Sequence, residues 1–566
     1  MERRLRAARG ELAADLVLSG GRIANVYTGE WLGQDVALFD GIIVGLGDYA
    51  GPRLEVQGCI LPGFIDGHLH LESSMLAPCE LARALLPLGT TTIVVDPHEI
   101  ANVLGTAGLD FLLAASQDLP LDIFFMLPSC VPASPLETAG ARLEAGDLAP
   151  YRGHHRVLGL AEVMNFPGVV SGSRELLEKL ALFPQGPVDG HAPLLSGKSL
   201  NAYRLTGIGS DHECTDSAEA LEKLRRGFYL MIREGSLAKN LADLLPAVPA
   251  PALRRTMLVT DDNHPEDILK KGHLDHLIKM ALATGLDPVQ AITLVTLNPA
   301  EYFRLRDRGA VAPGLAADLV IVQDIKEFRI DKVFKQGRML VDNGRLLPEV
   351  EFPSHPAPPP SFHLKALSAE AFSPAVESDT VKVICLIPDQ LLTEMRLMPP
   401  PVKDGRLAAD PARDLLKLAV IERHRASGNL GLGLVQGFGL QRGALASSVA
   451  HDSHNLVVVG AAESDMLVAA EHVARLQGGL AVVAGGQVLA DLPLPIAGLM
   501  STASLEEVAG AYSRVKAAAR SLGGTVEDPF MALSFLALPV IPDLKLTDFG
   551  LVDVRRFALV PLFGPE

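Results

Sequence analysis

The chain has 566 residues, of which 48% are hydrophobic, and its formal net charge is -17 at pH 7. A chain of this length can bury several cores, so we expect two or three domains. The acidic balance excludes an electrostatic nucleic-acid binder, whose binding surface would be basic.

The cysteines and the apolar runs indicate the cellular environment. Five cysteines form no C-x-x-C pair and leave an odd count, which is typical of reduced thiols and argues against disulfides or a zinc ribbon. The first residues contain no apolar signal segment, and no uncharged apolar run reaches about 18 residues. We therefore expect a cytoplasmic protein with no membrane partner.

The two flanks of the central segment carry short β-like runs. Residues 14–60 contain several of them between Gly and Asp turns, and the tetrapeptide Ala-Asp-Leu-Val at 14–17 recurs at 317–320. This pattern predicts one composite β-sandwich domain built from residues 1–60 and 306–345.

Residues 61–305 alternate apolar strands with helical stretches, which predicts βαβ units and a parallel sheet. The expected strands are 63–70, 91–98, 122–129, 157–164, 187–193, 207–213, 227–234 and 256–262. Eight strands indicate a (β/α)8 barrel of the TIM type, and no Gly-rich phosphate loop follows the first strand as a doubly wound sheet would require. Residues 346–380 are rich in Pro and Ser and read as a linker, and residues 381–566 read as a separate α+β domain.

Metal-ligand and proton-carrying residues gather at the carboxyl ends of these strands, where barrel enzymes place their chemistry. His68 and His70 lie two residues apart at the end of the first strand, so both rings leave the same face. The set is His68, His70, Asp96, His98, Glu99, Glu162, Asn165, His191, Asp211, His212, Glu213, Arg233, Glu234, Asp261 and Asp262.

Imidazoles and carboxylates without thiolates suit Zn, Fe or Mn and disfavour a structural zinc site. Four histidines and a shared carboxylate would be a reasonable set for two ions, which could lower the pKa of a bridging water. The pattern therefore predicts metal-assisted hydrolysis.

Several sequence motifs of the chain resemble those of a known family. The order HxH, Glu, His, His, Asp along the barrel is similar to the amidohydrolase superfamily, and the segments 63–75 (GFIDGHLHLESSM), 96–103 (DPHEIANV), 210–214 (SDHEC) and 446–455 (ASSVAHDSHN) resemble its bacterial adenine deaminases. The resemblance covers nearly the whole chain, including the third domain.

That resemblance implies conversion of adenine and water to hypoxanthine and ammonia on a binuclear Mn²⁺ or Fe²⁺ centre, with Zn²⁺ as a further option. It implies that His68 and His70 bind one metal with Asp261. His191 and His212 would then bind the second, and Glu162 would bridge the two. Strand four carries Glu162 and no lysine, which weakens a hydantoinase or dihydroorotase interpretation.

The chemistry of the site residues agrees with a deaminase. A bridging hydroxide would attack C6 of the purine, as in the zinc nucleobase deaminases, with Asp261 as general base. Glu99, Glu213 and Asp262 are unranked candidates for the further proton transfers, although Glu99 and Glu213 could instead orient the histidines beside them. Only one of the adjacent Asp261 and Asp262 can be the ligand, since their side chains would point to opposite faces of a strand.

Four residues are candidates for substrate binding: Asn165, Arg233, His451 and His454. Arg233 and Glu234 could equally clamp the substrate or pair with each other. The cluster 451–455 could bind a further metal, cover the barrel mouth and contact the purine, or form a structural turn.

Three functions stay open at this point. The first is adenine deamination, the second is deamination of another aminopurine or an aminopyrimidine, and the third is a catalytically silent scaffold. We expect a small-molecule purine as the partner, no nucleic acid, and a homo-oligomer.

Overall fold

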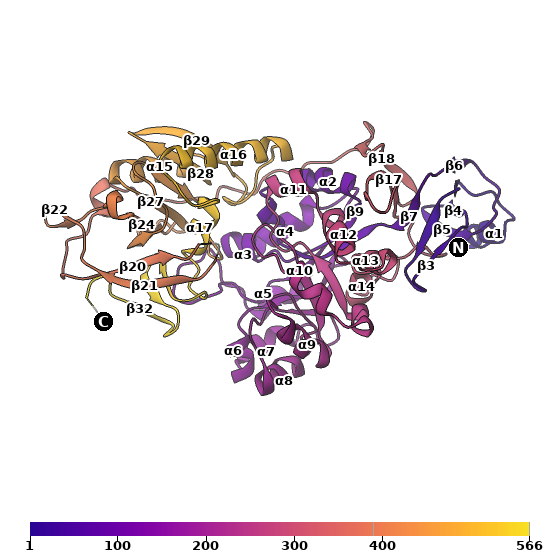
Figure 1. Cartoon of the computed structure of the whole chain (residues 1–566), viewed down its shortest axis with the longest axis horizontal. Coiled ribbons are helices and arrows are strands. Elements are labelled where there is room, and N and C mark those ends of the chain that lie inside the picture. Colours follow the sequence, from indigo (N-terminus) through magenta and orange to yellow (C-terminus); the bar gives the residue numbers. More distant parts are fainter. Residues whose placement is uncertain (389, 565–566) are drawn as a thin grey trace.

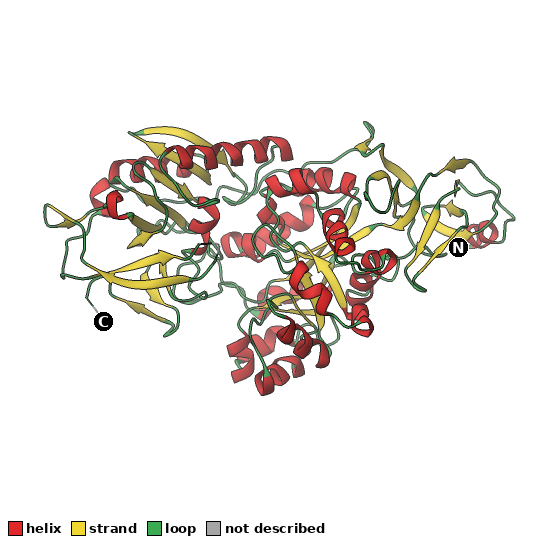
Figure 2. Cartoon of the chain, in the orientation of Figure 1, coloured by secondary structure: helices red, strands yellow, loops and turns green. Residues whose placement is uncertain are grey.

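The computed structural model describes residues 1–388 and 390–564. The molecule is elongated, with the first strands at one end, the C-terminal region at the other and a central part rich in helices between them (Figure 1). Helices surround the central strands, whereas the two ends are mostly strands (Figure 2). No helix within the described residues is long and apolar enough to cross a membrane.

Two sheets lie at the N-terminal end, and the second of them combines strands from both flanks of the chain. The first has the order β5-β4-β1-β6 and the second the order β19-β18-β17-β16-β7-β2-β3. In the second, β16 pairs antiparallel with β7, which joins residues 319–322 to residues 59–62. Helix α1 (Glu2–Ala8) precedes strands β1 (Leu16–Ser19), β2 (Arg22–Asn25), β3 (Glu30–Leu32), β4 (Val36–Phe39), β5 (Ile42–Leu46), β6 (Arg53–Glu55), β7 (Cys59–Pro62), β16 (Leu319–Val322), β17 (Ile330–Lys335), β18 (Arg338–Asp342) and β19 (Arg345–Leu346).

The central strands form the expected barrel, so the predicted (β/α)8 fold is confirmed. Five parallel strands run in the order β12-β11-β10-β9-β8 and three more in the order β13-β14-β15. The two sheets meet at a parallel bridge between Leu69 and Asp261, and the Gly209 amide donates to the Val188 carbonyl (2.8 Å) at the other seam. The strands are β8 (Phe64–Leu69), β9 (Thr90–Val95), β10 (Asp122–Leu127), β11 (Val157–Val163), β12 (Val188–Gly190), β13 (Ser210–Asp211), β14 (Tyr229–Arg233) and β15 (Thr256–Val259).

The barrel strands are shorter than the sequence indicates, because several of them end just before the polar residues that the apolar runs lead into. The helices around the barrel carry their apolar residues inward, as Leu81, Ala82 and Leu85 do on the second helix of the chain. These helices are α2 (Pro78–Leu85), α3 (His98–Leu104), α4 (Thr106–Ala115), α5 (Ala145–Leu148), α6 (Phe166–Ser171), α7 (Arg174–Leu180), α8 (Gly197–Leu205), α9 (Ser217–Arg225), α10 (Leu241–Leu244), α11 (Pro265–Lys271), α12 (Leu274–Ala283), α13 (Pro288–Thr293) and α14 (Leu297–Tyr302).

The C-terminal region is built around an eight-stranded sheet with the order β21-β20-β25-β24-β27-β26-β28-β29. Two of its central strands are buried along their whole length and are apolar apart from Lys417, as expected where both faces of a sheet are covered. Its elements are β20 (Val381–Leu386), β21 (Thr393–Met398), β22 (Val402–Lys403), β23 (Arg406–Leu407), β24 (Leu415–Ile421), β25 (Leu430–Gln436), β26 (Ala444–Ser447), β27 (Leu456–Gly460), α15 (Glu463–Arg475), β28 (Gly479–Ala484), β29 (Gln487–Pro493), α16 (Leu505–Ser521), α17 (Pro529–Phe535), β30 (Leu544–Thr547), β31 (Gly550–Asp553) and β32 (Ala558–Val560).

The C-terminal region packs directly against the barrel. The loop after β8 forms a bridge between Leu76 and Ser501, where the Ser501 amide donates to the Met75 carbonyl and the Ala77 amide to the Ser501 carbonyl, both at 2.8 Å. One hydrophobic cluster runs from the barrel into the C-terminal sheet.

Part of the segment expected as a linker packs against the C-terminal region. Within residues 347–380 the structure has no strand, yet Phe362 and Phe372 are buried in the core of the C-terminal sheet. An aromatic side chain removes enough apolar surface from water to hold such a segment against the domain.

Candidate metal centre

The barrel seam between β8 and β15 brings the first ligand candidates together. The His70 amide donates to the Asp261 carbonyl (3.2 Å), and the Asp261 amide donates to the His68 carbonyl (3.0 Å). Below them the Asp66 carboxylate accepts the His68 amide (3.2 Å) and the Thr260 hydroxyl (2.6 Å). The backbone therefore fixes both histidines and the aspartate relative to one another.

Three overlapping groups of side chains could hold metal ions at this end of the barrel, and in each group the ligand atoms lie within 4.8 Å of one another. Asp261 joins the HxH pair, since its Oδ1 lies 3.4 Å from His68 Nε2 and 3.3 Å from His70 Nε2. The groups are His68, His212 and Asp261; Glu162, His191 and His212; and His70, Asp96, His98 and Glu162.

Glu162 lies at the centre of these groups. Its Oε2 accepts hydrogen bonds from His191 Nδ1 (2.7 Å) and pairs with His212 Nε2 (2.9 Å). Its Oε1 lies 3.5 Å from His98 Nδ1 and 3.6 Å from His70 Nε2. Burial raises the pKa of this carboxyl, but His191 and His212 outweigh the burial and the pKa lies well below its ordinary value. One carboxylate thus touches four histidines.

The residues present fit a divalent metal. His68 Nε2, His98 Nδ1, His212 Nδ1 and Asp96 Oδ2 are buried and have no hydrogen-bond partner among the described residues. Buried polar atoms are rarely left unpaired, because their desolvation is costly. Imidazole nitrogens and carboxylate oxygens are the donors that Mn, Fe and Zn share.

Asp96 and His98 lie in this candidate centre, outside the ligand set that the resemblance implies. They follow β9 closely, so the signal in the sequence is their place at a strand end. The Asp96 carbonyl faces His70 Nδ1 (3.2 Å), which leaves His70 Nε2 for a metal.

Another group of possible metal ligands is already paired with a lysine. Asp211, Cys214 and Glu219 lie close enough together for a metal. The buried ammonium of Lys223 stands among them, 2.7 Å from Asp211 and 2.8 Å from Glu219. Because Asp211 directly precedes His212, these ion pairs fix the backbone beside His212 and leave no room for a metal ion.

Arg233 lies against the candidate ligand Asp261 rather than against Glu234. Its Nη1 donates to Asp261 Oδ2 (3.0 Å), and its guanidinium also forms a two-pronged pair with Glu213. Glu234 accepts the Leu241 amide (3.1 Å). Burial raises the pKa of Asp261, but the nearby imidazoles of His68 and His70 and the charge of Arg233 bring it well below its ordinary value. Asp261 is therefore ionised, as a ligand must be.

Two other sequence candidates lie outside the three groups. Asp262 accepts the Ser73 hydroxyl (2.5 Å), so of the two adjacent aspartates it is Asp261 that meets the histidines. Asn165 caps α6, where its Oδ1 accepts the Gly168 amide (2.9 Å).

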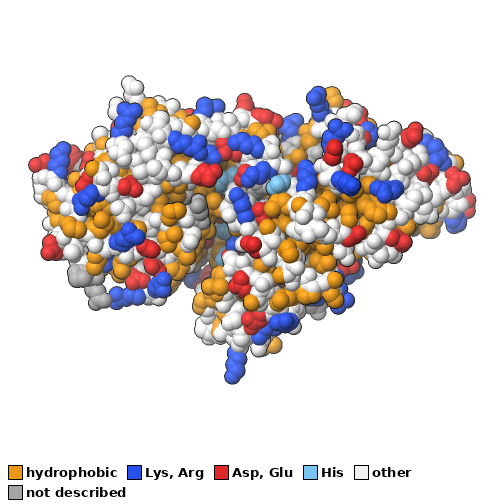
Figure 3. All heavy atoms as spheres, in the orientation of Figure 1, with side chains coloured by type: hydrophobic (Ala, Val, Ile, Leu, Met, Phe, Trp, Pro, Cys, Tyr) orange, Lys and Arg blue, Asp and Glu red, His pale blue; other side chains and the backbone are white. Residues whose placement is uncertain are grey.

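The C-terminal region reaches this site through one loop. His451 Nδ1 lies 2.6 Å from Glu99 Oε1, and His454 Nε2 hydrogen-bonds Glu99 Oε2. Asp452, between the two histidines, forms a further group with His98 and Glu99. Histidine atoms are visible at the boundary between the C-terminal part and the centre of the molecule (Figure 3).

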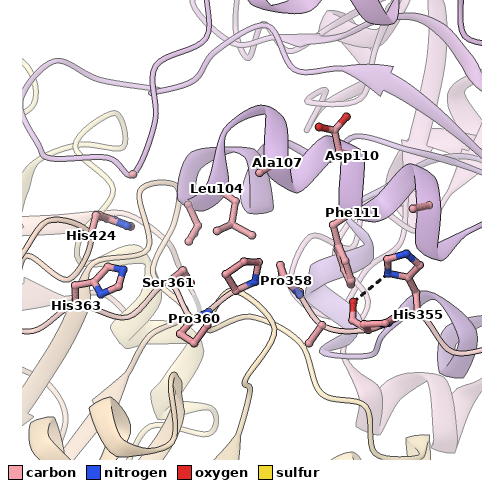
Figure 4. Close-up of a pocket in the computed structure, with 16 residues that line it drawn as sticks. Leu104, Ala107, Asp110, Phe111, His355, Pro358, Pro360, Ser361, His363 and His424 are labelled. Atoms are coloured by element: carbon pink, nitrogen blue, oxygen red, sulfur yellow. Dashed lines mark hydrogen bonds between the residues drawn. The ribbon is translucent and has the colours of Figure 1, made fainter.

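A separate cavity of about 630 Å³ lies outside the barrel mouth, between helices α3 and α4 and the Pro-rich segment. His363 and His424 lie at one end of it and His355 at the other (Figure 4). It contains none of the residues of the three metal groups.

Comparisons with known proteins describe the chain as a whole. The model of the amidohydrolase family matches residues 59–340, and the model of the adenine deaminase C-terminal domain matches residues 390–558. The chain is 50% identical over 562 residues to adenine deaminase 2 of Carboxydothermus hydrogenoformans and 48% identical over 563 residues to the adenine deaminase of Desulfatibacillum aliphaticivorans, each covering 98% of both chains. Among solved structures, a β-aspartyl dipeptidase of Fervidobacterium islandicum is 16% identical, covers 59% of this chain and 98% of its own, and has a TM-score of 0.44.

Proposed function

This chain belongs to the adenine deaminases within the amidohydrolase family, and from that premise we propose that it converts adenine and water to hypoxanthine and ammonia with a divalent metal. The observation that carries the proposal is the buried Glu162 surrounded by His70, His98, His191 and His212. A carboxylate shared in this way is suited to a pair of ions, for which we propose Mn²⁺ or Fe²⁺, with Zn²⁺ as a further option.

The bound metal would supply Lewis acidity at the reacting water and at the purine. Asp261 would take one proton from the water and pass it to the 6-amino nitrogen, so that ammonia leaves. A second group would protonate ring N1 and recover a proton from the new C6 oxygen as the carbonyl forms. The atoms then balance as adenine plus water to hypoxanthine plus ammonia.

For that second group we select Glu213 by its place beside the centre, although Arg233 holds it by a two-pronged pair. Glu99 faces two histidines of the C-terminal region, and Asp262 accepts a serine hydroxyl. Glu213 lies 3.6 Å from both His191 and His212, on the side of the centre that is least covered. We propose that Glu213 serves N1, with Arg233 controlling its position.

Ammonia release tests the function. We expect the purified, Mn-loaded protein to release ammonia from adenine when it is offered adenine, adenosine, isoguanine and cytosine separately. Release from another member of this panel alone would replace adenine as the substrate. No release from any of them would favour a catalytically silent scaffold.

A further inference from the structure

We propose that Glu99 is a positioning residue through which the C-terminal region controls metal loading: His451 and His454 hold its carboxylate so that His98 can face an ion. We call these three side chains, Glu99, His451 and His454, the Glu99 clamp. The inference deepens the proposed function, because it concerns the same metal centre.

The loop that carries the two histidines is fixed independently of Glu99. The fully buried Arg423 donates to the His454 carbonyl (2.6 Å), and His424 Nε2 lies 2.8 Å from the Ser453 carbonyl. Figure 4 shows His424 at one end of the outer cavity. The histidines are thus presented to the barrel by a preformed loop.

The hydrogen bonds define which nitrogen faces Glu99. His454 Nδ1 accepts the Ala450 amide (3.1 Å), so its Nε2 carries the proton and donates to Glu99. His451 presents Nδ1 to the other carboxylate oxygen (2.6 Å), and its ring stacks on Phe535 with centroids 4.7 Å apart. Both oxygens of Glu99 are therefore held from the C-terminal region.

Glu99 in turn faces His98, its neighbour at the start of α3. Glu99 Oε1 lies 3.4 Å from His98 Nε2, which leaves His98 Nδ1 toward Glu162 Oε1 (3.5 Å) and Asp96 Oδ2 (3.3 Å). A carboxylate behind one imidazole nitrogen is the arrangement that orients a metal-bound histidine. Without the two donors of the loop, the buried carboxylate would have to turn toward His98 or toward water.

The test compares variants that remove or keep the donors. His451→Ala with His454→Ala removes both, whereas His451→Asn with His454→Gln places amide N–H groups near the same positions. Lys516→Met is the matched control, because Lys516 joins the C-terminal region to Glu266 of the barrel away from the clamp. The amount of Mn²⁺ bound per chain is measured by mass spectrometry in metal-buffered solution, with circular dichroism to verify folding.

We expect the alanine pair to bind Mn²⁺ about 10- to 100-fold more weakly at one site of the centre. The Asn/Gln pair and Lys516→Met should bind as the wild type does. Unchanged binding in the alanine pair would overturn the proposal, and so would an equal loss in Lys516→Met. If the alanine pair does not fold, Glu99→Gln replaces it, with the same expected loss and the same contrary result.

Metal binding is measured without substrate, so this test is separate from the activity assay. A protein that releases no ammonia from adenine but loses an ion in the alanine pair would refute the proposed function alone. A protein that deaminates adenine and keeps both ions in the alanine pair would refute the clamp alone.

Discussion

The two sides of the metal centre differ in how they are covered. On the side of β8 and β9, the side chains of His68, His70 and His98 are 2%, 5% and 5% exposed. On the side of β12 to β14, His212 is 1% exposed, but His191 is 26% exposed, and Glu213 and Arg233 are each 13% exposed. We infer that adenine approaches from the β12 to β14 side, while the C-terminal region closes the other.

The largest effect should come from the residue that joins the two sides. Glu162→Gln should remove metal and activity together, because one carboxylate serves histidines of both sides. We expect kcat/KM to fall by about 10³-fold or more, the equivalent of several kcal/mol of lost metal catalysis. Metal analysis and the ammonia assay on the same sample measure both losses.

Glu234→Gln is the matched control, since Glu234 is a half-buried carboxylate bonded to a backbone amide outside the three groups. It should keep its metal and its rate. Two ions per chain and a full rate in Glu162→Gln would remove Glu162 from the centre.

A change confined to the open side should have a smaller effect. Arg233→Lys keeps the charge but loses the fork that holds Glu213 and Asp261 at once. We expect kcat to fall by about 10- to 100-fold while the metal content stays as in the wild type. Steady-state kinetics with metal analysis would test this, and a wild-type kcat or a loss of metal like that of Glu162→Gln would contradict it.

The smallest effect concerns the stability of the covering region. Lys545 lies on β30, its Nζ donates to the Leu391 carbonyl (3.0 Å), and burial lowers its pKa from 10.5 to about 7 although Asp543 opposes the shift. Between these two values the unfolded chain binds more protons than the folded one, so stability rises with pH.

Metal-loaded wild type should therefore gain about 1–2 kcal/mol of unfolding free energy between pH 7.5 and 9, and Lys545→Met should lack most of this gain. Urea denaturation at the two pH values measures the difference. Parallel pH dependence in both proteins would show that Lys545 keeps its charge when folded.

Sequence reasoning was most successful where the signal is local. The apolar run into His68 and His70 specifies both a strand and the side on which its ligands lie, and the eight repeats of that pattern gave the barrel. The same pattern contains Asp96 and His98, although the ligand set that the resemblance implies does not include them.

The Glu99 clamp was beyond such reasoning. Its two sides are 352 residues apart, and no periodicity links α3 to the loop before β27. The local pattern also could not show that Phe362 and Phe372 pack the Pro-rich segment against the C-terminal core. Two aromatic residues in a polar stretch form neither the helical nor the strand periodicity that would mark them as buried.

The bridge between Leu76 and Ser501 has a consequence for the integrity of the molecule. The bridge lies six residues after His70, and a shared apolar core continues the contact between the barrel and the C-terminal region. The covalent connection through residues 346–380 is therefore not what keeps these two parts together. A protease that cut this segment would produce two fragments on a denaturing gel from a particle that still migrates as one in native buffer.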